Sequence, residues 1–225
     1  FDVDFNRMID FHRRKKALVT LFSHPNSHPY DSGLLAADKD CAVCSWLSPE
    51  DARPRYYKNR VNAGLHIIDP AVLDIAGIDS EIIGLTDEAT GKTIKVDLDR
   101  QILKPLAGSG RMFCYDSPEY VKDMGTPERF HSVEADFLSG FVAARNLKNK
   151  QKAVFLDRDG TINKYVGFLN SADNFELLPG VAQAIKKIND SGLLCIVVTN
   201  QPVVARGEIP HAGVEEIHNK METLL

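Results

Sequence analysis

The chain has 225 residues, a length at which one or two globular domains are expected. Apolar residues make up 44% of it, charged residues make up 26%, and its mean hydropathy is -0.20. This composition is typical of folded globular proteins and excludes disordered, collagen-like and membrane-spanning classes. The net charge of -4 gives no electrostatic reason to bind nucleic acid or anionic lipid, so we expect neither as a partner.

The cysteines and the two ends of the sequence indicate the cellular compartment of the protein and whether the sequence is part of a longer chain. Four cysteines in a chain of this length, with no secretory signal at its start, indicate a reducing cytoplasm and not a disulfide scaffold. Phe1 stands where an initiator Met is expected, and a helix-like pattern stops midway at Leu225. We therefore expect a piece of a longer cytoplasmic protein, whose oligomeric state the sequence leaves open.

The first part of the chain alternates helical and extended patterns. Apolar spacing and turn residues predict, in order, a helix at 4–16, strands at 17–22, 33–37 and 42–47, an extended segment at 62–70, a helix at 95–106 and a strand at 112–115. A further helix is predicted to begin after Thr126, whose hydroxyl would cap it, with Pro127 at its first position. We expect its apolar stripe to pack into a core. The stripe consists of Phe130, Val133, Phe137 and Phe141.

A polar, charge-rich stretch at 146–152 separates this part from the rest. It is followed at once by the apolar run 153–156, which is typical of a buried strand. We therefore place a domain boundary at this stretch, which gives two domains at 1–146 and 151–225.

The second domain begins with a predicted strand, crossover helix and strand, at 153–156, 181–190 and 193–198. In such a unit the two strands are parallel and end at the same edge of the sheet. Asp157 and Asp159 follow the first strand, and Thr199 follows the second. Because ligands of open α/β sheets bind at that edge, we expect the three side chains to converge on one site.

These residues admit two interpretations. Asp, Gly and Thr are common in turns, so Asp157-Arg-Asp-Gly-Thr161 alone could be a plain turn. Together with Thr199, the two carboxylates favour a hard oxygen site that holds Mg²⁺ against a phosphate. One carboxylate could then attack phosphorus and form an aspartyl phosphate, while the other transfers protons. Thr199 would bind the phosphoryl oxygens.

Two strings, Asp157-Arg-Asp-Gly-Thr161 and Val197-Val-Thr-Asn-Gln201, resemble the first and second motifs of the haloacid dehalogenase superfamily of phosphatases. Three strings, Asp157-Arg-Asp-Gly-Thr-Ile-Asn163, Leu178-Pro-Gly-Val181 and Thr199-Asn-Gln-Pro-Val-Val-Ala-Arg-Gly207, are similar to its histidinol-phosphate and heptose 1,7-bisphosphate phosphatase group. The resemblance implies that Asp157 is the nucleophile and a Mg²⁺ ligand. It implies that Asp159 is the general acid and base and binds Mg²⁺ through its backbone carbonyl, and that Thr199 is the phosphoryl-binding hydroxyl. Substrate contacts are implied for the residues Tyr165, Gly167, Asn200 and Arg206.

Other parts of this family's pattern are expected beyond Leu225. They are the lysine of the third motif, the acidic residue of the fourth motif, which completes the Mg²⁺ site, and a Cys/His loop that would hold a structural Zn²⁺. Pro202 also stands where the family usually has a small hydroxyl residue.

Three strings of the first domain carry a second resemblance: Val61-Asn-Ala-Gly-Leu-His66, Val96-Asp-Leu-Asp-Arg-Gln-Ile-Leu-Lys-Pro105 and Tyr120-Val-Lys-Asp-Met-Gly-Thr-Pro-Glu128. They resemble the nucleotide-sugar pyrophosphorylases, in their mannose-1-phosphate guanylyltransferase-like branch. The resemblance implies that Asn62 and Gly64 line a sugar pocket, with Lys104 a weaker candidate there. It implies that Asp123 is one of two aspartates that hold Mg²⁺ across a nucleoside triphosphate. Asp123 precedes Met124 and Gly125, which are typical of a turn, so apart from the resemblance it could simply end a strand.

The glycine-rich nucleotide loop and the first metal aspartate of that family would precede Phe1. The sequence thus predicts an α/β protein with Rossmann-like parallel or mixed sheets, in which an incomplete nucleotidyltransferase-type domain is followed by an incomplete haloacid-dehalogenase-like domain. Its substrates would be sugar phosphates and a nucleoside triphosphate, and its phosphatase part would hydrolyse a heptose bisphosphate for nucleotide-sugar biosynthesis. Histidinol-phosphate phosphatase is the alternative among enzymes, and a non-catalytic binding or scaffold unit is the alternative of another class.

Overall fold

The computed structural model describes residues 1–26, 29–79, 81, 83–87 and 90–225, and these divide into two compact units. The N-terminal unit comprises residues 5–53 and 60–117. The C-terminal unit comprises residues 1–4, 54–59 and 118–225. No helix among the described residues is both long and apolar enough to cross a membrane.

The N-terminal unit is built on a five-stranded mixed sheet with the strand order β3-β2-β4-β1-β5. β1 lies inside the sheet, antiparallel to β4 and parallel to β5. Its residues are almost all buried, as expected for a strand covered on both faces. The strands are β1 (Val19–His24), β2 (Leu34–Ala37), β3 (Val43–Leu47), β4 (Val61–Ile68) and β5 (Met112–Asp116).

The sheet shares its apolar core with helical residues that include Val72, Ile102, Leu103 and Leu106. The helix predicted at 95–106 is shorter, because Asp97 accepts a hydrogen bond from the backbone N–H of Arg100 at 2.9 Å and thereby caps the helix there. It consists of a π-helical turn followed by a 3₁₀ turn that contains Pro105. The helical segments are α1 (Phe5–Lys15), η1 (Pro29–Asp31), α2 (Val72–Ile75), η2 (Leu98–Leu103) and η3 (Lys104–Leu106).

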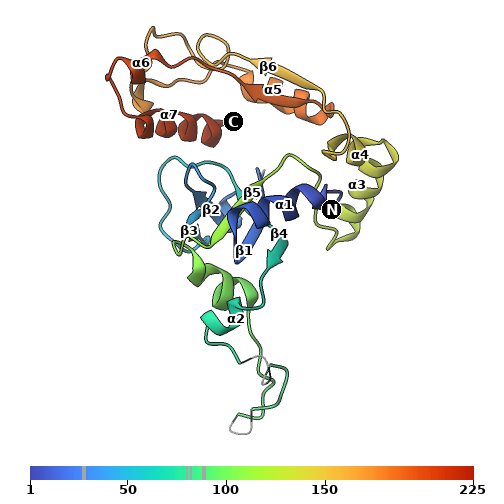
Figure 1. The fold of residues 1–225 in the computed structure, drawn as a ribbon. Helices are drawn as coiled ribbons and strands as arrows, with labels where there is room; N and C mark the ends of the chain where they lie inside the picture. Colours follow the sequence, from blue (N-terminus) through green and yellow to red (C-terminus); the bar gives the residue numbers. More distant parts are fainter. Residues whose placement is uncertain (27–28, 80, 82, 88–89) are drawn as a thin grey trace. The chain divides into compact units, whose positions relative to one another are not determined.

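The C-terminal unit contains the predicted parallel strand pair. β6 (Ala153–Leu156) pairs in parallel with β7 (Leu194–Val197), and α5 (Val181–Asp190) is the crossover helix between them (Figure 1). Gly180 precedes α5 with a φ of 81°, a left-handed conformation that glycine adopts without strain. The other helical segments of the unit are α3 (Pro127–Leu138), α4 (Phe141–Arg145), η4 (Ala172–Asn174), α6 (Pro202–Ala205) and α7 (His211–Leu224).

One apolar cluster holds this strand pair against its helices. Ile162 and Ile217 are fully buried in it, and Leu156 and Val197 contribute from the strands. The opposite face of the pair is open: Phe155 is 67% exposed, although the sequence predicts a buried strand. Side chains alternate between the faces of a strand, so only one face of each strand reaches the cluster.

The predicted apolar stripe is the second difference from the sequence expectation. α3 ends at Leu138, and Phe141 lies on the next helix, α4, which follows Gly140 with a φ of 78°. No residue of α3 is buried, and Phe137 on this stripe is 70% exposed. Helical spacing shows that apolar residues share a face but does not show what covers that face. The cap of this helix is as predicted, because Thr126 accepts from the backbone N–H of Arg129 at 3.3 Å.

The compact units do not follow the predicted domains. Residues 118–146 group with the later part of the chain, whereas the predicted first domain is 1–146. The units are defined by compact packing, whereas the predicted domains are defined by sequence and family resemblance. The domain boundary at residues 146–151 therefore stays a prediction.

We expect Ile217→Ala to lower the free energy of unfolding by about 2–5 kcal/mol, because it leaves a cavity in the core of the C-terminal unit. Leu138→Ala on α3 removes a side chain that is 79% exposed and should change this free energy by less than about 0.5 kcal/mol. Urea unfolding followed by circular dichroism measures both. Equal losses would contradict the placement of α7 in the core.

Candidate active site

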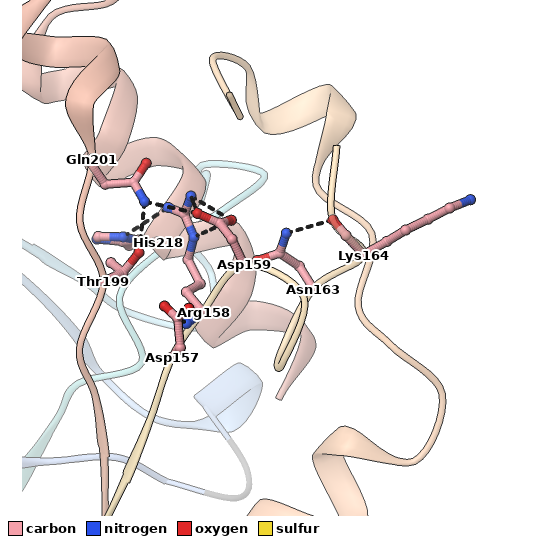
Figure 2. A network of polar contacts seen from close by, with 8 residues as sticks. All are labelled: Asp157, Arg158, Asp159, Asn163, Lys164, Thr199, Gln201 and His218. Carbon is pink, nitrogen blue, oxygen red and sulfur yellow. Dashed lines mark hydrogen bonds and ion pairs between the residues drawn. The ribbon is translucent and has the colours of Figure 1, made fainter. Parts of the chain in front are cut away.

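The edge at which β6 and β7 end brings the predicted site residues together. Leu156 pairs with Val197, and the backbone N–H of Val198 donates to the carbonyl of Leu156 at 2.8 Å. Asp157 directly follows β6, and Thr199 lies two residues beyond β7, so both leave the sheet at one edge (Figure 2). The convergence expected from a parallel βαβ unit is therefore present.

A tight turn follows β6 and sets the directions of the two aspartates. The backbone N–H groups of Ile162 and Asn163 donate to the carbonyl of Arg158 at 2.8 and 3.1 Å. Gly160 lies in this turn with a φ of 84°, a conformation in which a side chain would be strained. The turn reverses the chain directly after Asp159.

Asp157 and Asp159 have different surroundings. Asp157 is exposed, and its Oδ1 accepts from the backbone N–H of Arg158 at 2.7 Å. The carboxylate of Asp159 accepts from Nε of Arg158 at 3.1 Å and from Nη2 at 2.9 Å to each oxygen. Within the described part of the chain, no other hydrogen-bond donor reaches the Asp157 carboxylate. One carboxylate of the pair is thus open to a ligand, and the other is held by protein groups.

Gln201 links the two ends of the site. Its side-chain amide donates to Oδ2 of Asp159 at 3.1 Å and to Oγ1 of Thr199 at 2.7 Å (Figure 2). A single amide group therefore fixes the hydroxyl after β7 against the carboxylate after β6. Gln201 has no predicted role from the sequence, although its position two residues after Thr199 is a usable signal.

Arg158 and His218 are two further polar residues of the site that the sequence does not predict. Arg158 is 0% exposed, and its Nη1 lies 3.2 Å from Nε2 of His218, on α7. Burial lowers the pKa of His218, and the charge of Arg158 lowers it further, while Asp159 and Glu215 act in the opposite direction. No local pattern marks His218, because its contact spans 60 residues.

The predicted substrate contacts lie in the segments that follow β6 and β7 in the chain. Tyr165 and Asn200 are exposed, and Gly167 has a φ of 77° in the loop after the turn. The guanidinium carbon of Arg206 lies 4.0 Å from the ring centroid of Phe168, which is a cation–π contact. Arg206, directly after α6, is therefore in contact with the loop that follows β6.

The candidates from the first domain lie elsewhere in the fold. On β4, Oδ1 of Asn62 accepts from the backbone N–H of Gly64 at 3.2 Å and from Nε2 of His66 at 2.9 Å. Gly64 has a φ of 74°, which favours glycine at that position. Lys104 donates to the side chains of Ser48 and Asp51 at 2.8 and 2.6 Å. The last contact lowers the pKa of Asp51.

Asp123 belongs to the C-terminal unit, whereas Asn62 and Gly64 belong to the N-terminal unit. Its carboxylate is exposed, forms an ion pair with Arg129 and accepts from the backbone N–H of Gly125 at 2.9 Å. This ion pair lies at the start of α3, so the described contacts of Asp123 all come from its own loop and helix.

The carboxylate oxygens at this sheet edge are ligands of the type that Mg²⁺ binds. Mg²⁺ is usually bound through one or two carboxylates, substrate phosphates and water, and not by an all-protein cage. Asp157 offers an exposed carboxylate, which meets that requirement. Within the described ranges, no group of three or more His, Cys, Asp and Glu side chains is placed to hold a metal ion.

Comparison with known proteins gives partial matches. No family model matches the chain. A stretch of 73 residues is 41% identical to the D-glycero-D-manno-heptose-1,7-bisphosphate 7-phosphatase of Thermosynechococcus vestitus, and it covers 32% of this chain and 37% of that relative.

Two solved structures also align with the chain. The D,D-heptose 1.7-bisphosphate phosphatase from B. bronchiseptica, complexed with magnesium and phosphate, is 36% identical over 33% of this chain and 42% of that one, with a TM-score of 0.32. A putative glucose-1-phosphate thymidylyltransferase from Bacillus anthracis, in complex with a sucrose, is 14% identical over 59% of this chain and 48% of that one, with a TM-score of 0.40.

This chain therefore spans less than half of the length of each of these proteins. The names of the curated relatives agree with the resemblance predicted from the motifs after β6 and β7. The chain contains a stretch that is similar in sequence to the heptose bisphosphate phosphatases of the haloacid dehalogenase superfamily.

Proposed function

We propose that the C-terminal unit carries the nucleophile and phosphate-binding part of a Mg²⁺-dependent phosphatase that acts on a sugar bisphosphate of the heptose 1,7-bisphosphate type. One observation carries the proposal: the parallel register of β6 and β7, which brings Asp157 and Thr199 to one sheet edge. The sequence similarity to phosphatases named for this substrate supports the choice of substrate class.

Asp157 is the proposed nucleophile because its carboxylate is exposed. One of its oxygens would attack phosphorus in line with the sugar oxygen, and the bond between phosphorus and that oxygen would break. Water would then attack phosphorus of the aspartyl phosphate, which releases inorganic phosphate and restores the carboxylate. Mg²⁺, when bound to the Asp157 carboxylate and the Asp159 carbonyl, supplies positive charge that reduces the repulsion between the nucleophile and the phosphate.

Asp159 and Thr199 are proposed to assist these two steps. Once Oδ2 of Asp159 has left the Gln201 amide and carries a proton, Asp159 would give that proton to the departing sugar oxygen and later take one from the attacking water. The Thr199 hydroxyl accepts a hydrogen bond from Gln201, so its own proton is directed away from that amide and can be donated to a phosphoryl oxygen.

We propose a sugar-1-phosphate nucleotidyltransferase as the function of the preceding part of the chain, with the domain boundary at residues 146–151. The specific observation in its favour is that Asn62 is held in one orientation by Gly64 and His66, as a residue that recognises a sugar hydroxyl must be. Asp123 would bind Mg²⁺ after its ion pair with Arg129 opens. The substrates would be a sugar 1-phosphate and a nucleoside triphosphate, in a cytoplasm that keeps the four free thiols reduced.

We expect Asp157→Asn to reduce phosphate release from heptose 1,7-bisphosphate by at least about 10³-fold, because an amide oxygen is a poor nucleophile. Nucleotidyl transfer should be unchanged. Asp190→Asn is the matched control, since Asp190 is exposed on α5 and paired only with Lys186 in the described structure. Phosphate release is measured on the full chain with and without Mg²⁺.

Three outcomes would contradict this account. Faster hydrolysis of histidinol phosphate than of the heptose bisphosphate would favour the alternative substrate. Loss of both activities in Asp157→Asn would contradict two independent sites. Calorimetry that detects neither Mg²⁺ nor sugar phosphate binding would favour a non-catalytic scaffold.

We further expect Arg206→Ala and Phe168→Leu each to raise KM by about threefold to tenfold, because each removes the same cation–π contact of a proposed substrate-binding residue. The double variant should show no more than the larger single effect, since contacting residues are not additive. Lys187→Ala, an exposed change on α5, is the control. Additive effects of Arg206 and Phe168 would show that the two residues act separately.

A further inference from the structure

Arg158 is an unusual residue for a protein interior. It is a cation with 0% exposure and is among the largest fully buried side chains of the chain. Burying a guanidinium group costs free energy unless its donors are paired. All three of its nitrogen atoms have partners: Nε and Nη2 bind Asp159, and Nη1 contacts His218. The guanidinium group is therefore held by Asp159 on one edge and by His218 at Nη1.

The contact with His218 fixes the form of the imidazole. Arginine has only donors, so Nη1 must donate and Nε2 of His218 must accept, which places the imidazole proton on Nδ1. The helix that carries His218 is itself anchored. Ile217 is fully buried in the core, and Nζ of Lys220 donates to the carbonyl of Ala172 at 2.7 Å. His218 thus presents its acceptor from a fixed element.

At its other end, Arg158 determines how Asp159 lies. Nε donates to Oδ1 at 3.1 Å and Nη2 donates to Oδ2 at 2.9 Å, and this bidentate geometry allows little rotation of the carboxylate. Gln201 holds Oδ2 from a third direction (Figure 2). The orientation of the carboxylate thus depends on a guanidinium group whose own position depends on α7.

We propose that His218 is a positioning residue for Asp159 that acts through Arg158. This rests on the proposed role of Asp159 in proton transfer. A carboxylate that transfers a proton must point at the reacting oxygen, and small misplacements reduce the rate far more than they reduce substrate binding. His218 does not contact the reacting atoms and changes the rate only through the position of Arg158.

The test uses two amide substitutions in the full chain. The Oε1 atom of His218→Gln can take the place of Nε2 and accept from Arg158, whereas the Oδ1 atom of His218→Asn takes the place of Nδ1 and does not reach. We expect His218→Asn to lower kcat for phosphate release about tenfold and to change KM by less than about twofold. His218→Gln should keep both kcat and KM within about twofold of the unsubstituted chain. His211→Asn, an exposed change at the start of α7, is the control.

A second readout does not depend on activity. The ¹⁵N NMR signal of the Arg158 Nε–Hε group, assigned by its loss in Arg158→Lys, should exchange slowly with solvent in the original chain and in His218→Gln, and faster in His218→Asn. If His218→Asn does not fold, His218→Leu removes the acceptor while keeping an apolar volume, and the same results are expected of it.

The outcomes separate this proposal from the proposed function. If the chain has no phosphatase activity but its Arg158 signal responds as expected, the proposed function is contradicted. The link from His218 through Arg158 to Asp159 would then stand without a catalytic role. An active chain in which His218→Asn keeps its kcat, or in which the Arg158 signal does not change, would overturn the positioning role. Equal losses in His218→Asn and His218→Gln would also overturn it, since the acceptor would then not be the feature that matters.

Discussion

The parallel pairing of β6 and β7 is the constraint on which the rest of the site depends. Because Leu156 faces Val197 in that register, the chain leaves both strands at one edge, and the polar residues beyond them must share the same space. The crossover through α5 and the apolar cluster behind the strands hold the pair in place. A shift of one residue in either strand would turn Asp157 or Thr199 to the opposite face.

The two aspartates after β6 illustrate how one turn produces two chemical environments. Asp157 is exposed and accepts one hydrogen bond from a backbone N–H, whereas Asp159 accepts hydrogen bonds from the side chains of Arg158 and Gln201. Carboxylates in different surroundings can perform different tasks in one reaction. An open carboxylate suits attack on phosphorus and contact with a cation, and a held carboxylate suits a proton transfer that requires a fixed direction. The proposed division of roles follows this difference.

The sequence predicts the local elements of the site well and their surroundings poorly. β6 and α5 have the predicted bounds, because an apolar run and glycines before and after an amphipathic stretch are local signals. The exposure of Phe155 and Phe137 could not be predicted, since burial depends on what packs against a face and the residue pattern is the same in both cases. His218 was missed for a related reason: it meets Arg158 only through the packing of α7, across 60 residues of chain.

The central claim is that Asp157 attacks phosphorus at this sheet edge, and chemical trapping of the acyl phosphate tests it most directly. The full chain is mixed with sugar bisphosphate and Mg²⁺, quenched within milliseconds and treated with borohydride, which reduces an aspartyl phosphate to homoserine. The account predicts homoserine at position 157 by peptide mass spectrometry, and none at position 159 or in Asp157→Asn. Homoserine at another aspartate, or phosphate release without any modified residue, would contradict it.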